Sequence, residues 1–407
     1  MAQLLPTPLA RVPSGSPDES LLCGRTAEVQ KLVENCEAGR LTVVSSAPGL
    51  GLSCLLRSGV APALKRAGYV TILFSDWQGR AFAARLREAV LKAIHEEVDG
   101  GFVAGAEPLN ELISKAQRQT GCRIAILLDQ FEDYLRCHVS TDISDSFDAE
   151  LSNAIGGRVA SFVVAMQEAA VESFLRLSQY VPNLMGYSLT LAGLTPDAAG
   201  QLVRNLAARS KMQVEPAAVE QLIAAPAAAA GSGVNPLFLT LGVENLIDKE
   251  RRLKSTTLHA SIVEANGGAD RLILDSMDLL LDAINSTHAE LLFRWVTLLR
   301  GEDGSRLPVS EQALIEHSGK WDRFAMTLIA LLTKEGVLRT IELPLGIRYE
   351  FARVSMTAIV QDWWQRRETA LIARQRAAFR VRSISIAVGS ILAAYGVYLF
   401  LVAKKII

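Results

Sequence analysis

The sequence predicts an α/β fold with a buried parallel sheet, followed by a helical region, a smaller mixed region and one long apolar helix. Three observations predict this order. In the first half, short runs that are apolar on both faces alternate with helical patterns, which is typical of a parallel sheet covered on both sides. Helical patterns dominate after Leu194. Ile384–Ala403, a run of 20 residues without a charge, lies near the end of the chain.

The first half of the chain contains the elements of the sheet. A turn and a helix over Leu21–Glu37 lead to the first apolar strand, Leu41–Ser45. Apolar runs bounded by turn residues predict further strands at Tyr69–Ser75, Arg123–Asp129, Phe162–Met166 and Tyr187–Leu191. Helical patterns predict helices at Ser53–Ala67, Phe82–Val98 and Leu109–Thr120. This alternation of strand and helix indicates a parallel sheet.

The second half of the chain changes character. Thr195-Pro196-Asp197 is a typical helix start, with a capping hydroxyl, a proline in the first turn and an acid beside it. Further on, amphipathic patterns predict helices at Ala289–Arg300, Ser310–His317 and Trp321–Lys334, and strands at Val337–Leu343 and Ile347–Phe351. Three helices and a hairpin are the outline of a winged helix.

Composition narrows the classes of function. The net charge of −1 gives no bulk attraction to nucleic acid. The five cysteines have no metal-ligand spacing, so we expect free thiols in a reducing compartment. Residues 1–20 are rich in proline and serine, which predicts a disordered tail.

The segment Val43–Leu56, VVSSAPGLGLSCLL, has the pattern of a strand, a phosphate-binding loop and a helix start. Gly49 and Gly51 allow backbone amides to turn towards phosphate oxygens at the positive end of a helix. Ser53 stands where a hydroxyl would reach Mg²⁺, whereas Leu52 occupies the position of the lysine that contacts the β- and γ-phosphates. The candidate nucleotide contacts in this segment are Ser46, Gly49, Gly51, Ser53 and Cys54.

A strand that ends in a carboxylate completes the pattern. Asp129 follows the apolar run of the third strand, where its side chain would lie beside the loop and bind Mg²⁺ or its water, together with Ser53. Glu132 or Asp133 could orient an attacking water, and we assign the candidate catalytic role to Glu132. Alternatively, these acids only cap a strand. The pairing with the loop favours a P-loop NTPase core with a parallel sheet.

Several motifs resemble the bacterial novel-STAND branch of signal-transduction P-loop NTPases, relatives of the NACHT and AP-ATPases. They are LLCGR at Leu21–Arg25, VVSSAPGLGLSCLLRSGVAPAL at Val43–Leu64, ILLDQFEDYL at Ile126–Leu135, Asn235-Pro236-Leu237, and YEFARVSMTAIVQDWW at Tyr349–Trp364. The resemblance covers Leu21 to Arg367. It implies a core at 21–193, a helical lid domain at 194–284 and a winged-helix domain at 285–367.

The resemblance also implies a function and its site. Relatives clamp ATP or ADP with Mg²⁺ between core, lid and winged helix, and nucleotide exchange releases an oligomerising state. Pro236 of the lid and Arg353 of the winged helix would then contact nucleotide.

This chain departs from the family pattern where the family contacts phosphate. Leu52 replaces the lysine, Gln167 an arginine after the core strand, and Ser46 a glycine. In the winged helix, Arg353 replaces a histidine and Val354 the acid after it. Loss of one charge-assisted hydrogen bond, worth ~1.5–3 kcal/mol, would weaken nucleotide binding by about 10- to 150-fold. We therefore expect a weak or inactive ATPase, with Arg353 as a candidate substitute cation.

The apolar run Ile384–Ala403 predicts a transmembrane helix, since its length at ~1.5 Å per residue matches a bilayer core of ~30 Å. The basic residues before it predict that residues 1–383 are cytoplasmic, with 368–383 as a basic juxtamembrane segment, although Lys404 and Lys405 follow the run. We expect a single C-terminal anchor in the bacterial inner membrane.

Three functions remain open from the sequence. The first is a membrane-anchored nucleotide switch that contacts lipid, self-associates or engages a separate sensor or effector protein. The second is a nucleotide-independent membrane scaffold for partner proteins. The third is a membrane-tethered winged-helix regulator, which the few basic residues near the third helix, Lys320, Arg323 and Lys334, argue against. We expect no nucleic-acid partner.

Overall fold

The computed structural model describes residues 22–77, 81–97, 107–137, 147–225, 229–230, 233–273, 275, 286–301, 306–319, 322–334, 337–343, 346–351 and 369. The chain divides into two units, residues 1–357 and 358–407. Arg353, Val354, the juxtamembrane segment and the predicted span Ile384–Ala403 lie outside the described residues, apart from Thr369. No helix in the described part has the length and apolarity that a membrane crossing needs.

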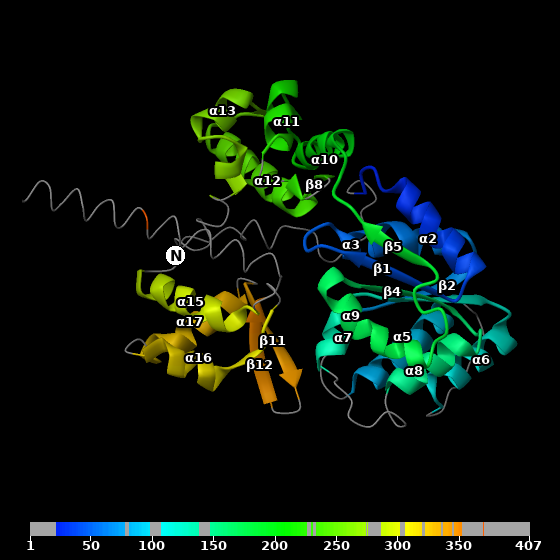
Figure 1. Cartoon of the computed structure of the whole chain (residues 1–407). Coiled ribbons are helices and arrows are strands. Elements are labelled where there is room, and N and C mark those ends of the chain that lie inside the picture. The colour runs from blue at the N-terminus through cyan, green and yellow to red at the C-terminus, as the bar shows by residue number, and fades with distance from the viewer. Residues whose placement is uncertain are drawn as a thin grey trace, which may run out of the picture. The chain divides into compact units, whose positions relative to one another are not determined.

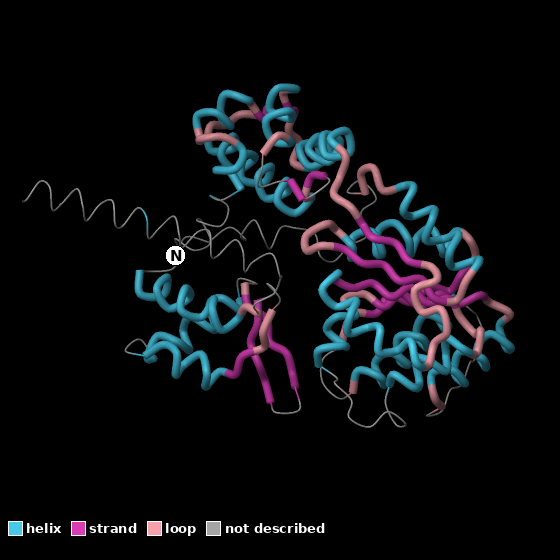
Figure 2. The backbone as a smooth tube through the Cα atoms, in the orientation of Figure 1, coloured by secondary structure: helices cyan, strands magenta, loops and turns pink. Residues whose placement is uncertain are grey.

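A five-stranded parallel sheet forms the first part of the large unit (Figures 1 and 2). Its strands are β1 (Leu41–Ser46), β2 (Tyr69–Phe74), β3 (Arg123–Leu128), β4 (Ser161–Gln167) and β5 (Ser188–Leu191). All five were predicted. The order is β2-β3-β4-β1-β5, so β4 lies between the strand before the glycine loop and the strand before Asp129.

Alternate residues of the strands enter two separate apolar cores. Val43 of β1 and Ile126 of β3 belong to one core, whereas Val44 and Leu127 belong to the other. This division follows from the twofold periodicity of a strand, whose successive side chains point to opposite faces. It explains why the strands are apolar at nearly every position.

Helices cover both faces of this sheet. One core includes residues of α5 (Phe82–Glu97), α6 (Leu109–Thr120), α7 (Phe131–Cys137), α8 (Phe147–Gly156) and α9 (Val171–Phe174). The other includes residues of α2 (Thr26–Ala38) and of the helix after the glycine loop. That helix consists of α3 (Leu52–Cys54), a π-helical turn (Leu55–Val60) and α4 (Ala61–Arg66). Two 3₁₀ turns, Glu168–Ala170 and Leu175–Gln179, flank α9.

A helical region follows the sheet and has its own core. Its helices are α10 (Pro196–Arg209), α11 (Pro216–Ile223), α12 (Pro236–Arg252) and α13 (Ala260–Ala265). Short strand pairs, β6 (Gln213–Val214) with β9 (Thr257–Leu258) and β7 (Ala229–Ala230) with β8 (Gly233–Val234), connect them. The predicted helix start at Thr195 is confirmed, because its side chain accepts the Ala198 N–H at 3.3 Å.

The last described region, which we call the C-terminal region, comprises residues 286–351. It contains α15 (Ser286–Leu299), α16 (Glu311–Ser318), α17 (Asp322–Lys334), β11 (Leu338–Leu343) and β12 (Gly346–Phe351), all of which were predicted. A third strand that was not predicted, β10 (Val309–Ser310), pairs with β12 to complete an antiparallel sheet. The indole N–H of Trp295 donates to the Leu314 carbonyl at 2.9 Å, which joins α15 to α16.

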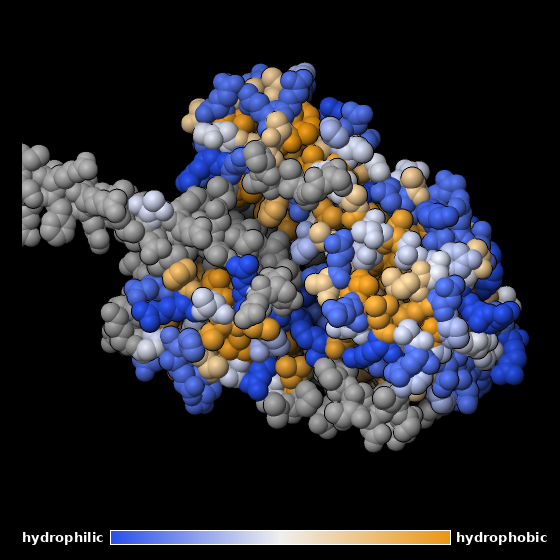
Figure 3. All heavy atoms as spheres, viewed as in Figure 1, coloured by the Kyte–Doolittle hydropathy of each residue, from blue (hydrophilic) through white to orange (hydrophobic). Residues whose placement is uncertain are grey.

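The surface in Figure 3 mixes polar and apolar side chains. Among the described residues, the large exposed apolar side chains are Leu175, Tyr180, Tyr187, Leu253, Leu307, Met326 and Ile347. Single exposed apolar residues of this kind are normal for a folded protein and identify no site by themselves.

Candidate functional site

The glycine loop between β1 and α3 adopts the backbone conformation that its sequence predicts. Gly49 has φ 84° and Gly51 has φ 85°, values that a residue with a Cβ rarely adopts. The Gly51 carbonyl accepts the Leu55 N–H at 2.9 Å, so the helix begins directly at the second glycine. The loop therefore has the strand–turn–helix context that a phosphate-binding loop requires.

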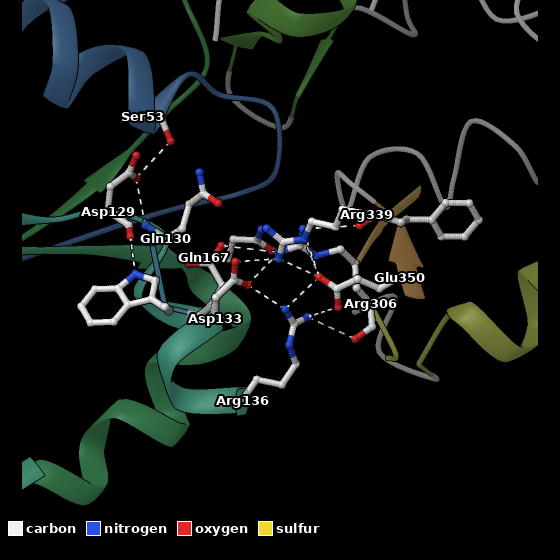
Figure 4. Close-up of polar contacts among 12 residues, drawn as sticks. Ser53, Asp129, Gln130, Asp133, Arg136, Gln167, Arg306, Arg339 and Glu350 are labelled. Carbon is white, nitrogen blue, oxygen red and sulfur yellow. Dashed lines mark hydrogen bonds and ion pairs between the residues drawn. The ribbon is translucent and has the colours of Figure 1, made fainter. Parts of the chain in front are cut away.

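Ser53 and Asp129 meet at the end of this loop, although they are far apart in the sequence (Figure 4). The Ser53 hydroxyl donates to Asp129 Oδ1 at 3.0 Å, and the Gln130 N–H donates to the same oxygen at 2.9 Å. Asp129 is 1% exposed, and its Oδ2 is buried without a hydrogen-bond partner. This orphaned oxygen beside a hydroxyl fits a hard cation such as Mg²⁺, whose remaining ligands would be phosphate and water.

The electrostatics of Asp129 also favour a bound cation. Burial raises the pKa of its carboxyl above the ordinary value, although the hydrogen bond from Ser53 and the nearby Arg57 guanidinium lower it. A buried carboxylate with a raised pKa gains stability from any cation that binds to it.

Aromatic residues fix the backbone at Asp129. The indole N–H of Trp77 donates to the Asp129 carbonyl at 2.7 Å, and the Asp129 N–H donates to the Phe74 carbonyl at 2.8 Å. The rings of Trp77 and Phe131 pack edge to face with centroids 5.2 Å apart. Sequence reasoning missed Trp77, whose only signal was its place shortly after the second strand.

Leu52 brings no charge to the site. Its side chain is partly buried and packs against the core beneath α2. The neighbouring Cys54 is also partly buried, and Ser46 is buried at the end of β1 opposite Gln167 of β4. Among the candidate residues in this segment, Ser53 contacts Asp129 directly.

Glu132, the candidate catalytic residue, lies at the start of α7. Its Oε2 accepts the Gln167 N–H at 3.3 Å, and its Oε1 lies 3.9 Å from Nη2 of Arg306. Burial and the neighbouring Asp133 raise the pKa of Glu132 to about 7, against the attraction of Arg306. A carboxyl with a pKa near neutrality is suited to accept a proton at the pH of the cell.

The N-terminus of α12 contacts the glycine loop. Asn235 accepts the Leu237 N–H at 3.0 Å as the helix cap, and its Nδ2 donates to the Pro48 carbonyl at 3.3 Å. A Cβ at Gly49 would meet the Asn235 amide at 3.0 Å, and one at Gly51 would lie 3.8 Å from the Pro236 ring. The predicted contact residue Pro236 thus lies beside the loop, and Asn235 is a contact that sequence reasoning missed.

Arg25 ties the loop to the connection with the helical region. The buried guanidinium donates to the Leu50 carbonyl at 3.3 Å and to the Ala192 carbonyl at 2.7 Å. It also pairs with Glu28 at 2.9 Å. Arg25 therefore links the loop to the chain at the end of β5.

A buried ion cluster joins α7 to the C-terminal region (Figure 4). Its members are Asp133, Arg136, Arg306, Arg339 and Glu350. Although burial opposes ionisation of Asp133, the three arginines hold the pKa of its carboxyl below the ordinary value. None of these contacts was predicted; the one sequence signal was the spacing of Asp133 and Arg136 on one helix face.

The described residues contain no cluster of three or more histidine, cysteine, aspartate or glutamate side chains with metal-binding geometry. A cation at this site would depend on one carboxylate, one hydroxyl and the phosphates of its ligand, which is the usual arrangement for Mg²⁺ with nucleotides.

A family model described as Novel STAND NTPase 1 matches residues 15–383. Among solved structures, a Walker-type ATPase of Pyrococcus abyssi is 14% identical over 85% of this chain and 98% of that chain, with a TM-score of 0.49. The ORC2 protein of Aeropyrum pernix in its ADPNP–ADP complexes is 13% identical over 88% and 97%, with a TM-score of 0.46. Cdc6p from Pyrobaculum aerophilum is 10% identical over 88% and 96%, with a TM-score of 0.41. No curated protein matches the sequence.

Proposed function

Because the chain belongs to the Novel STAND NTPase 1 family, we propose that its core binds ATP or ADP with Mg²⁺ weakly and acts as a nucleotide switch with little or no hydrolysis. The observation that carries this proposal is the pair of Ser53 and Asp129 at the end of the glycine loop, with Asp129 Oδ2 buried and unsatisfied. A buried polar atom without a partner costs ~1–3 kcal/mol, and a cation bound beside Ser53 would offset this cost.

The loop, the Ser53–Asp129 pair and α12 would each have a separate role in binding the nucleotide. The loop around Gly49 and Gly51 would receive the phosphates, and Ser53 and Asp129 would hold Mg²⁺. The bound cation would supply charge neutralisation at the phosphates. Pro236 of α12 lies beside the loop, where it would contact the nucleotide.

Leu52 supports weak binding and poor turnover. Its apolar side chain packs into the core and supplies no charge to the β- and γ-phosphates. Phosphoryl transfer depends almost entirely on positioning and charge stabilisation, so this loss should reduce turnover more than affinity. Glu132 remains the candidate base, with its carboxylate held by the Gln167 N–H.

The output of the switch would lie at the membrane. We extend the proposal to Ile384–Ala403 as a span of the bacterial inner membrane, with residues 1–383 in the cytoplasm, because the run is uncharged and basic residues precede it. Self-association or capture of a separate sensor or effector protein would follow the change of nucleotide.

Nucleotide titration of the full-length protein in detergent tests the proposal. Calorimetry with ATP and with ADP, each with and without Mg²⁺, should show weak binding that depends on Mg²⁺, with negligible phosphate release. The substitution Asp129→Asn should remove the dependence on Mg²⁺. Leu52→Lys should tighten binding by about 10- to 150-fold, because it restores a charge-assisted hydrogen bond.

Leu52→Met is the matched control, since it changes the shape of the side chain without adding a charge, and its affinity should equal that of the wild type. Absence of binding to millimolar nucleotide in both the wild type and Leu52→Lys would contradict the proposal and favour a nucleotide-independent scaffold. Rapid turnover that Asp129→Ala abolishes would contradict the part of the proposal that concerns weak hydrolysis.

A further inference from the structure

Two helices of the helical region, α10 and α12, pack against each other and end in turns of the same construction (Figure 1). Each turn has a lysine in the left-handed conformation, Lys211 after α10 and Lys254 after α12, both with φ 58°. Glycine is the usual residue at such a helix end. The turns lead into β6 and β9, which pair in parallel, and the Gln213 N–H donates to the Thr256 carbonyl at 2.9 Å. The two helix ends therefore lie side by side.

The two ends together carry a group of exposed basic side chains, which we call the basic patch. Its members are Arg209, Lys211, Arg251, Arg252 and Lys254, and all five are exposed. Arg251 connects the two helices, because its guanidinium donates to the Ser210 carbonyl at 3.5 Å. Neither 209–213 nor 251–256 contains an acid.

The acids of α12 that precede the patch leave it positive. Glu250 is 1% exposed, and its Oε1 accepts the His259 N–H at 2.7 Å and lies 3.0 Å from Nδ1 of the same residue. Asp248 is partly buried one turn before Arg252. The exposed surface of the two helix ends therefore carries a net positive charge.

An exposed apolar side chain lies within the basic patch. Leu253, between Arg252 and Lys254 at the end of α12, is 63% exposed, the largest fraction among the large exposed apolar side chains of the described residues. Cations near the C-terminus of a helix stabilise it, so the basic residues have a local reason to be there. An exposed leucine contributes nothing to that stabilisation, and its contact with water is unfavourable.

A leucine surrounded by lysine and arginine fits an anionic lipid surface. Each basic residue near such a surface strengthens binding by about 5-fold, and an apolar side chain gains further free energy by entering the boundary between headgroups and acyl chains. The long stems of lysine and arginine let the charges stay at the headgroups while the backbone approaches. A nucleic acid would use the charges in the same way but offers no apolar layer to Leu253.

We propose that the basic patch is a peripheral binding site for anionic phospholipid, in which Leu253 enters the membrane surface and the surrounding arginines and lysines contact the headgroup phosphates. The site lies in the helical region and is distinct from the apolar run Ile384–Ala403. It requires no nucleotide at the Ser53–Asp129 site.

Hydrogen–deuterium exchange of the full-length protein in vesicles tests this site. Two compositions are compared: phosphatidylcholine alone, and phosphatidylcholine with an equal amount of phosphatidylglycerol. Amide exchange at 209–213 and 251–256 should be slower in the anionic vesicles, and molar salt should remove the difference. Exchange in β1 and β4 should be the same in both compositions.

Substitutions in the patch should reduce this protection. Arg252→Gln and Lys254→Gln should each lower it by up to ~5-fold, because each removes one charge at the lipid surface. Leu253→Ser should lower it by up to ~10-fold, because it removes the apolar contact. In Leu253→Trp, brominated phosphatidylglycerol should quench additional fluorescence relative to the wild type, which reports insertion directly.

Two variants outside the patch are matched controls. Lys92→Gln removes one exposed charge from α5, where Lys92 lies 3.9 Å from Glu96. Ile347→Ser removes an apolar side chain that is 60% exposed on β12. Both should leave the protection of the patch unchanged.

Equal exchange at the patch of the wild type in the two vesicle compositions would overturn the proposal. Binding of duplex DNA in detergent that Arg252→Gln weakens and Leu253→Ser leaves unchanged would also overturn it, since the patch would then be a nucleic-acid site. If the run Ile384–Ala403 does not insert, the proposed membrane anchor fails. Protein mixed with preformed anionic vesicles should even then show protection at the patch.

Discussion

Replacing Glu132 by glutamine should stabilise the protein at alkaline pH and have little effect in acid. In the folded chain this carboxyl is buried beside Asp133, and its pKa rises from 4.5 to about 7. Between these two values the folded state retains a proton that the unfolded chain releases. The free energy of unfolding therefore falls as the pH rises from 4.5 to about 7, and the full penalty is present above that range.

The size of the effect follows from this difference. At ~1.36 kcal/mol for each tenfold change in proton affinity, burial of the ionised carboxylate costs up to ~3 kcal/mol above neutral pH. Glutamine retains an oxygen to accept the Gln167 N–H, which lies 3.3 Å from Glu132 Oε2, but carries no charge. The variant should thus gain up to this amount at pH 8.5 and almost nothing near pH 4.5.

Urea unfolding of wild type and Glu132→Gln across this pH range measures the difference. Glu290→Gln serves as the control, since Glu290 pairs with Arg294 on an exposed face and its replacement should stay within ~0.5 kcal/mol at every pH. A Glu132→Gln variant that is less stable than wild type at pH 8.5, or equally affected at both ends of the range, would refute the electrostatic argument.

Two further predictions concern the loop. Gly49→Ala should lower the free energy of unfolding by ~1–3 kcal/mol, since Gly49 has φ 84° and an added Cβ would meet Asn235 at 3.0 Å. Gly121→Ala is the control, because Gly121 has φ 72° but open space around it, and it should destabilise the fold less. Equal decreases of stability in thermal unfolding would exclude the contact with Asn235 as a cause. Asn235→Ala should cost ~1 kcal/mol from the lost cap of α12 and weaken nucleotide binding, whereas the cap variant Thr195→Ala should change stability alone.

The strands and the glycine loop could be predicted because each has a local cause. A parallel strand that is buried on both faces is apolar at nearly every position, so the strand can be recognised from its own residues alone. Gly49 and Gly51 are needed where the backbone takes a positive φ, so the residues themselves indicate the turn. The pairing of Ser53 with Asp129 followed from the common edge at which parallel strands end.

The ion cluster, the strand β10 and the contact of Asn235 could not be predicted, because their partners are distant in the sequence or leave no local pattern. Arg306 and Asp133 are 173 residues apart, and no periodicity links them. The short strand β10, only 2 residues long, is too brief to leave an alternating pattern. Asn235 was noted for its neighbours but not for its contact with Pro48, since a side-chain amide donating to a loop carbonyl has no sequence signature.

Leu52 limits how far nucleotide could shift a conformational equilibrium of this protein. A ligand shifts such an equilibrium only by the difference between its affinities for the two states. Because Leu52 supplies no charge to the β- and γ-phosphates, the loop contributes less to that difference than a loop with a lysine would. Weak binding could therefore bias only two states of nearly equal free energy.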